Sequence, residues 1–153
     1  MAAYFLDSSA LVKRYAAETG TAWVKGLIDP AAGTLVLVAR ITGVETVAAL
    51  ARKRKGDLLS PADAATALAT LRKELAGLFL TVEVTAALLT SATDLAEEHA
   101  LRGYDAVQLA AALEANGERL RLALAPLTLV TADKELLDAA AAEGLSTDDP
   151  NNH

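Results

Sequence analysis

The segment Thr34-Leu35-Val36-Leu37-Val38 is an unbroken apolar run that is rich in β-branched residues. Runs of this kind are typical of strands that are buried on both faces of a parallel sheet. Other short apolar segments resemble it, and segments with helical character separate them. This alternation predicts an α/β fold in which helices cover both faces of a mostly parallel sheet. The expected strands are Ala3–Leu6, Thr34–Val38, Phe79–Val84 and Leu127–Val130.

Capping residues mark the helix boundaries at two places. Ser60 precedes Pro61 and Asp63, the pattern of an N-cap followed by proline at the first helical position. Gly144 is a natural C-cap for the last helix. No repeat or linker divides the chain, so we expect a single domain over residues 1–147 and a polar, frayed tail over residues 148–153. The expected helices cover residues 9–17, 21–28, 41–55, 61–77, 86–101, 104–116 and 134–142.

The composition excludes several classes of active site. The chain has 153 residues, of which 53% are hydrophobic and 22% charged, as in a folded globular domain. It contains no cysteine, which rules out disulfides, thiolate catalysis and cysteine-based zinc sites. With only two histidines, a histidine-rich metal centre or a Ser-His-Asp triad has little support.

The charge and hydropathy of the chain bear on its partners and location. The net charge of −6 argues against a general polyanion binder, unless the acids gather where a metal ion neutralises them. The N-terminus lacks the basic and apolar regions of a signal peptide. The longest apolar stretch, Leu122–Val130, contains a proline and is shorter than the ~20 residues of a membrane span. We therefore expect a cytoplasmic protein with no membrane partner.

Two aspartates follow expected strands directly. Asp7 comes after Ala3–Leu6, and Asp133 comes two residues after Thr131 at the end of the last strand. Ligands of open α/β sheets bind at the carboxyl ends of the strands. If the first and last strands are neighbours, both carboxylates reach the same edge of the sheet.

Two further acids occupy unusual positions in helices. Glu45 lies at the margin of the apolar stripe of its helix, and Asp105 opens a very apolar helix. Each acid also has an ordinary interpretation: Asp105 and Asp133 as helix-start acids, and Glu45 as a flanking surface residue. Four converging carboxylates would repel one another in a partly desolvated site, and a divalent cation removes that penalty. Oxygen-only ligands favour Mg²⁺ or a similar hard cation, which can activate water and neutralise a phosphodiester.

Four stretches, taken in order, resemble the successive motifs of bacterial PIN-domain toxins of the VapC type. The resemblance covers essentially the whole chain; the segment around Asp105 is the most specific and the one around Glu45 the weakest. The stretches are Asp7–Lys13, the helix-borne Glu45, Gly103–Ala112 and Thr131–Leu136.

The resemblance implies a three-layer α/β/α sandwich and Mg²⁺- or Mn²⁺-dependent endonucleolytic cleavage of RNA. It also implies a small VapB-like antitoxin partner and frequent homodimerisation. Thr131 would be the helper hydroxyl of the family, and Ser8 is a weaker candidate. The acidic quartet of the family, which holds the metal and acts in catalysis, falls on Asp7, Glu45, Asp105 and Asp133.

Outside the acids, two features bear on binding. The basic run Arg52, Lys53, Arg54 and Lys55 ends the helix of Glu45. It is either a solvated helix end favoured by the helix dipole or a patch that guides RNA phosphates. Apolar residues of the first two helices, such as Trp23, belong either to the core or to a groove for the antitoxin. His99 is expected to be an ordinary helical surface residue.

Other functions remain open at this stage. A receiver or phosphoryl-transfer domain also has an aspartate after its first strand, but those patterns need a second acid nearby, and Ser8 and Ser9 follow Asp7. A non-catalytic module that binds RNA or a protein partner could keep the same fold, although the complete quartet speaks against it. Within the nucleases, a housekeeping RNA-processing enzyme is the alternative to a toxin.

Overall fold

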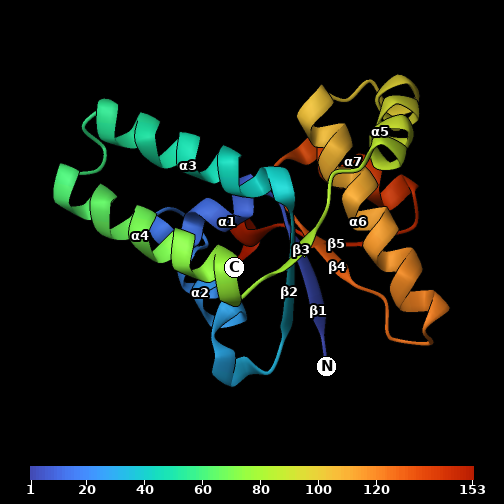
Figure 1. Ribbon diagram of the computed structural model, residues 1–153, viewed down its shortest axis with the longest axis horizontal. Coiled ribbons are helices and arrows are strands. Elements are labelled where there is room, and N and C mark those ends of the chain that lie inside the picture. Colours follow the sequence, from blue (N-terminus) through green and yellow to red (C-terminus); the bar gives the residue numbers. More distant parts are fainter.

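The protein is built around a five-stranded sheet in which every pairing is parallel. The computed structural model describes residues 1–153 (Figure 1). The strand order is β3-β2-β1-β4-β5, so the first strand lies at the centre. The strands are β1 (Ala3–Leu6), β2 (Leu35–Ala39), β3 (Leu80–Val82), β4 (Thr128–Val130) and β5 (Ser146–Asp148).

Seven α-helices cover the two faces of the sheet. In Figure 1, α1 to α4 lie on one side of the strands and α5 to α7 on the other. No helix combines the length and the apolar composition that crossing a membrane requires. The helices are α1 (Ser8–Tyr15), α2 (Thr21–Ile28), α3 (Arg40–Lys55), α4 (Pro61–Gly77), α5 (Ala86–His99), α6 (Gly103–Arg121) and α7 (Lys134–Ala142).

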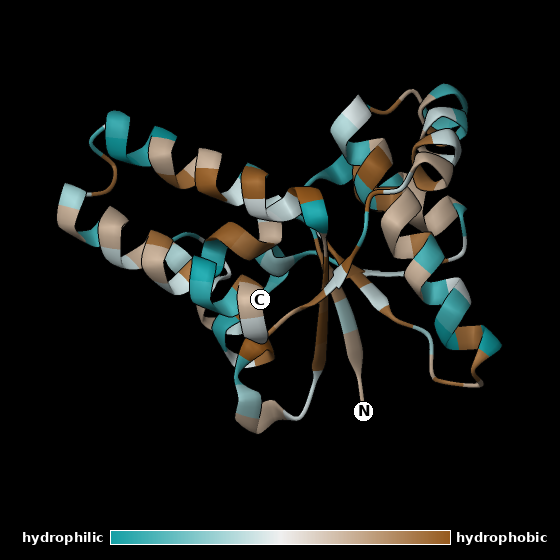
Figure 2. Cartoon of the chain, viewed as in Figure 1, coloured by the Kyte–Doolittle hydropathy of each residue, from teal (hydrophilic) through white to brown (hydrophobic).

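The central strands bury side chains on both faces, as their unbroken apolar sequences predict. Successive side chains of a strand point to opposite faces of a sheet. Phe5 and Leu37 accordingly join the core beneath α5, α6 and α7, whereas Leu6 and Val38 join the core beneath α1 to α4. Figure 2 shows β2 as a hydrophobic strand between the two helical layers. The expected three-layer α/β/α sandwich is therefore confirmed.

The chain reverses direction across the sheet at β1. From β1 it steps outward through β2 to β3, and then crosses back to place β4 on the other side of β1. A crevice for ligands forms at such a reversal, outside the carboxyl ends of the two strands concerned. The fold thus places a binding position above the ends of β1 and β4.

The structure differs from the sequence-based expectation at the C-terminus. Ser146–Asp148 forms a fifth strand that pairs with β4, and a short 3₁₀ helix, Pro150–Asn152, follows it. Pro150 is buried, and the His153 ring stacks on Trp23 with 4.1 Å between centroids. The expectation that this tail frays is wrong, because an edge strand of polar residues is held by backbone hydrogen bonds that hydropathy does not reveal. Helix α6 also continues to Arg121, five residues beyond its expected end.

Gly20 provides a test of how firmly the C-terminal segment packs. Its φ is +86°, and an added Cβ would collide with the Pro150 carbonyl. Gly33 is a matched control, because its φ is +66° but nothing lies within 4 Å of the added Cβ. Both alanine variants should lose about 1–2 kcal/mol for the left-handed backbone, and Gly20→Ala about 1–3 kcal/mol more for the collision. Urea unfolding measures both losses; equal losses would contradict the packing of Pro150 on Gly20.

Candidate active site

Asp7 and Thr131 meet at the carboxyl ends of β1 and β4. The two strands are paired so that Leu6 lies opposite Val130, and the next residue of each strand therefore enters the crevice together. The Thr131 hydroxyl donates to Asp7 Oδ2 at 2.6 Å. The sequence-based condition for a shared site, that the first and last expected strands are neighbours, is thus met.

Asp7 is held by a shell of hydrogen bonds. Its Oδ1 accepts from the Ala10 amide at 3.0 Å, which makes Asp7 the N-cap of α1, and from the Ser9 hydroxyl at 2.7 Å. Only 3% of the residue is exposed. Burial raises the pKa of Asp7 to about 6, although the hydrogen bonds from Thr131, Ser9 and Ala10 favour the charged form. A cation beside Asp7 would relieve the unfavourable burial of its charge.

Asp133 is also a helix cap that faces the crevice. Its Oδ1 accepts from the Leu136 amide at 3.0 Å at the start of α7, and its Oδ2 accepts from Arg102 at 3.1 Å. The Thr131 hydroxyl oxygen accepts from the Asp133 amide at 3.1 Å. One threonine therefore joins Asp7 to Asp133.

Asp105 lies in the first turn of α6 and interacts with the other three acids. Arg102 Nε is 3.4 Å from Asp105 Oδ2, so one exposed guanidinium bridges Asp105 and Asp133. Burial and the negative charge of Asp133 raise the pKa of Asp105. The negative charge of Asp105 in turn contributes to the raised pKa of Asp7 and to that of Glu45. Asp105 therefore interacts electrostatically with both of these acids as well as with Asp133. Asp105 and Asp133 are thus helix-start acids, and the charge of Asp133 acts on Asp105.

Glu45 reaches the crevice from the opposite helical layer. It lies in the second turn of α3 and is half-buried. Its Oε1 accepts from Gln108 Nε2 at 2.7 Å. Burial raises the pKa of Glu45, and contacts with the Gln108 amide and the Ser8 hydroxyl oppose the shift. Glu45 is therefore not a flanking surface residue.

The side chains of the quartet offer only carboxylate oxygens as metal ligands. No three of these carboxylates have ligand oxygens within 4.8 Å of one another, so they do not form a closed cage. Mg²⁺ usually keeps several waters beside one or two protein carboxylates. The available ligand atoms are all carboxylate oxygens, and the negative charge of partly buried carboxylates is unfavourable without a cation. The site therefore fits Mg²⁺ or Mn²⁺.

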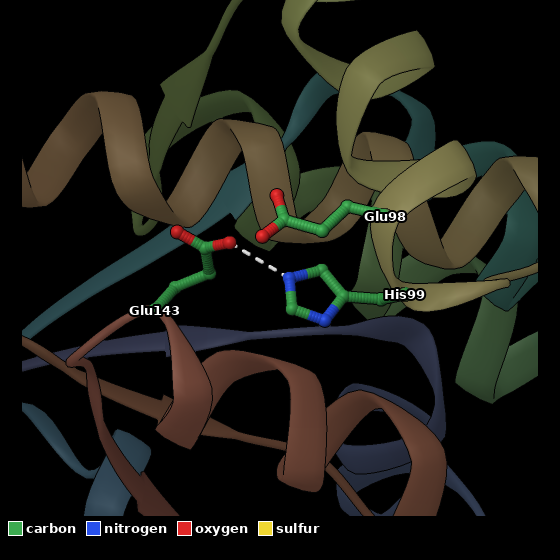
Figure 3. Close-up of side chains that lie close together, drawn as sticks. All are labelled: Glu98, His99 and Glu143. Carbon is green, nitrogen blue, oxygen red and sulfur yellow. Dashed lines mark hydrogen bonds and ion pairs between the residues drawn. The ribbon is translucent and has the colours of Figure 1, made fainter.

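A different group of side chains does meet the 4.8 Å spacing: Glu98, His99 and Glu143 (Figure 3). His99 Nε2 lies 2.7 Å from Glu143 Oε1, which ties the end of α5 to the end of α7. Glu143 follows the last residue of α7, whereas Asp133 precedes the first, so this group is separate from the quartet. His99 is a partly buried contact rather than an ordinary surface residue.

A groove of about 510 Å³ runs along α3 and includes Glu45. Ser8, Glu45, Arg52 and Tyr104 line it together with apolar side chains. The residues of the basic run have different surroundings. Arg52 borders the groove, whereas Lys53 Nζ lies 2.7 Å from Glu18 Oε1.

Sequence-based prediction did not identify three residues of the site. Ser9 bonds to Asp7 and also accepts from the Ala132 amide at 2.9 Å, so it links the two strand ends. The position of Ser9 at the start of a helix was the available signal, but it did not distinguish Ser9 from Ser8. Arg102 and Gln108 gave no signal in the sequence, because their partners Asp133, Thr42 and Glu45 are distant along the chain.

Comparison with known proteins agrees with this fold. The PIN domain family model matches residues 4–142. The chain belongs to the PIN domain family. No curated protein matches the sequence.

Solved structures share the fold of this PIN domain. PAE2754 from Pyrobaculum aerophilum is 24% identical, with a TM-score of 0.66 over 99% of this chain and 91% of that one. Mycobacterium tuberculosis VapC20, a Sarcin-Ricin loop cleaving toxin, is 18% identical, with a TM-score of 0.62 over 93% and 95%. Rickettsia felis VapBC2, bound to a DNA fragment from its promoter, is 14% identical, with a TM-score of 0.61 over 96% and 98%.

The buried charge of Asp7 predicts how stability depends on pH. Its pKa is about 6 in the folded protein, against an ordinary value of 3.8 for a solvated aspartate, so the folded state binds the proton more tightly. The resulting loss of unfolding free energy is absent below pH ~4 and grows as the pH rises. It is complete above pH ~6, where it reaches about 2–3 kcal/mol. Asp7→Asn should therefore raise the melting temperature at pH 7.5 in EDTA by roughly 5–10 °C.

The same comparison at pH 4 should show little difference between the two proteins. Asp138→Asn, which changes an exposed acid of α7, is the control and should have no such effect. An Asp7→Asn variant that is less stable than the native protein at pH 7.5 would contradict the prediction, because the hydrogen bonds to the charged carboxylate would then outweigh its burial.

Proposed function

We propose that this PIN domain is a divalent-metal-dependent endoribonuclease and the toxin of a VapC-type toxin–antitoxin pair. The observation that carries the proposal is the charge interaction of Asp105 with Asp7, Glu45 and Asp133, three acids that come from distant parts of the chain. The fold likeness to VapC20, a Sarcin-Ricin loop cleaving toxin, and to VapBC2 supports it. Hydrolysis of a phosphodiester is the chemistry for which a carboxylate-only site is suited.

Mg²⁺ or Mn²⁺, when bound, would polarise the phosphodiester and lower the pKa of a water molecule. Asp7 and Asp105 would hold the ion, with Glu45 and Asp133 as further direct or water-mediated ligands. Asp7 is oriented by Ser9 and Thr131, which leave its carboxylate little freedom to turn away. Because α1 and α7 fix Asp7 and Asp133 as caps, both acids are in place before the ion binds.

Arg102 supplies the positive charge nearest to the quartet. Its guanidinium lies between Asp105 and Asp133, and three quarters of its side chain is exposed. An exposed guanidinium at this position can exchange its carboxylate partners for an RNA phosphate, with which it forms paired hydrogen bonds. Arg102 would thus hold the substrate once a metal ion balances the two aspartates.

The groove along α3 is the proposed path of the RNA. Arg52 at its border would contact a phosphate, while Lys53 is committed to Glu18. We assign the remaining residues of the basic run, Arg54 and Lys55, a general attraction for the RNA from the exposed end of α3.

A small antitoxin and a second copy of the chain complete the proposal. A VapB-like antitoxin would cover the acidic crevice, and two copies of the chain would form a homodimer. The action of the toxin would take place in the cytoplasm. A housekeeping RNA-processing nuclease and a non-catalytic binding module are the alternatives: the first would not stop growth on expression, and the second would not turn RNA over.

The catalytic proposal predicts that RNA cleavage depends on both metal and Asp7. Purified protein should cleave RNA with Mg²⁺ or Mn²⁺ and lose the activity in EDTA. Asp7→Asn should reduce the cleavage rate on the order of 10²-fold or more, because a ligand of the ion is lost. Asp138→Asn should cleave like the native protein. Cleavage that survives both chelation and Asp7→Asn would falsify the proposal.

The groove predicts different effects for two neighbouring basic residues. The measurement uses an Asp7→Asn background, which is expected to bind RNA without cleaving it. In that background Arg52→Gln should weaken RNA binding. It should also reduce the slope of the logarithm of the RNA-binding constant against the logarithm of the salt concentration by about 0.7, the value for one phosphate contact to a single strand. Lys53→Gln should leave the slope unchanged, since Lys53 is paired with Glu18. An unchanged slope in Arg52→Gln would mean that the run is only a solvated helix end.

A further inference from the structure

Gln108 is a buried polar residue that belongs to neither the acidic quartet nor the apolar core. It lies in α6, one turn after Asp105, and only 1% of it is exposed. Its partners are on α3, in the other helical layer: Thr42, which is fully buried, and Glu45 one turn further along that helix. Gln108 therefore spans the end of the sheet and connects the helix of Asp105 to the helix of Glu45.

Both hydrogens of the Gln108 amide have an acceptor. Nε2 donates to Glu45 Oε1 at 2.7 Å and to Thr42 Oγ1 at 2.9 Å. The Thr42 hydroxyl also lies 3.3 Å from Gln108 Oε1, to which it can donate. Because an ionised carboxylate only accepts, Nε2 rather than Oε1 must face Glu45. The hydrogen bond to Glu45 is of the charge-assisted kind, which is stronger than a bond between neutral groups.

Glu45 needs such a partner in order to stay in the crevice. Its flexible side chain is half-buried and is repelled by the nearby charge of Asp105. Without a donor on the inner side, rotation toward solvent would relieve both the burial and the repulsion. The fixed Gln108 amide opposes that rotation, and Thr42 in turn fixes the amide.

We propose that Gln108 is a positioning residue that holds the Glu45 carboxylate toward Asp105, so that the two acids from opposite layers can bind the same divalent cation. The inference rests on the proposed function. Outer hydrogen-bond partners of metal ligands orient those ligands, and their loss typically weakens metal binding roughly 10–100-fold. A merely structural role for Gln108 would affect folding stability and leave the metal affinity unchanged.

Binding of Mn²⁺ to the purified full chain, measured by electron paramagnetic resonance without RNA, tests the inference independently of catalysis. Gln108→Met keeps the side-chain length and removes the donor, and Gln108→Glu keeps the shape and places a second carboxylate against Glu45. We expect the Kd for Mn²⁺ to rise roughly 10–100-fold in Gln108→Met. We expect a larger rise in Gln108→Glu.

Substitutions at Thr42 keep the test decisive even if the Gln108 variants do not fold. Thr42→Val removes the hydroxyl that holds the amide and should raise the Kd, whereas Thr42→Ser retains the hydroxyl and should bind like the native protein. Thr46→Val is the matched control, because Thr46 is equally buried on α3 but donates only to the Thr42 carbonyl. Thermal unfolding of each variant separates a loss of stability from a loss of metal affinity.

The outcomes distinguish this inference from the proposed function. Native protein that binds Mn²⁺ and cleaves RNA, with an unchanged Kd in Gln108→Met or Thr42→Val, overturns the positioning role alone. An equal rise in Thr42→Val and Thr46→Val also overturns it, since the effect would then come from repacking of α3. Native protein that binds no Mn²⁺ overturns both.

Discussion

The repulsion among four carboxylates in a partly desolvated crevice is the constraint on which the site depends. The acids are brought there by backbone geometry: two follow neighbouring parallel strands, one opens a helix and one comes from the opposite layer. Apolar burial on both faces of the sheet supplies the free energy that keeps them together against their mutual repulsion. The surrounding polar groups stabilise or offset the charges of these carboxylates. Ser9 and Thr131 stabilise the charge of Asp7, Gln108 stabilises that of Glu45, and Arg102 offsets Asp105 and Asp133.

The fold was predictable because its central strands carry an unambiguous signal. A strand such as β2, which is apolar on both faces, fits only a sheet that is covered on both sides, and the alternation with helices requires parallel pairing. Strand β5 escaped prediction for the opposite reason. It is a three-residue edge strand of Ser146, Thr147 and Asp148, and its pairing depends on backbone groups that do not differ between residue types.

The acids of the site were predictable to different degrees. Asp7 and Asp133 were indicated by their places after strands, since parallel strands end at a common edge. Glu45 was indicated only by its position beside an apolar stripe and by the family resemblance, because nothing local to α3 reveals that α6 lies opposite. The supporting residues Ser9, Arg102 and Gln108 depend on contacts between distant segments, and residue type alone did not separate them from caps, surface charges or core positions.

Asp7 and Asp133 each cap a helix with the same carboxylate that faces the crevice. This double use restricts the ways in which a descendant of this protein could lose its activity. Replacement by an apolar residue would remove a carboxylate that the proposed catalysis needs and would also leave the first turn of a helix without its cap, at a cost of about 1 kcal/mol. Asparagine, serine or threonine would keep the cap but would remove the carboxylate that the proposed catalysis needs. Degenerate relatives that survive as binding proteins should therefore carry these residues where the aspartates stood.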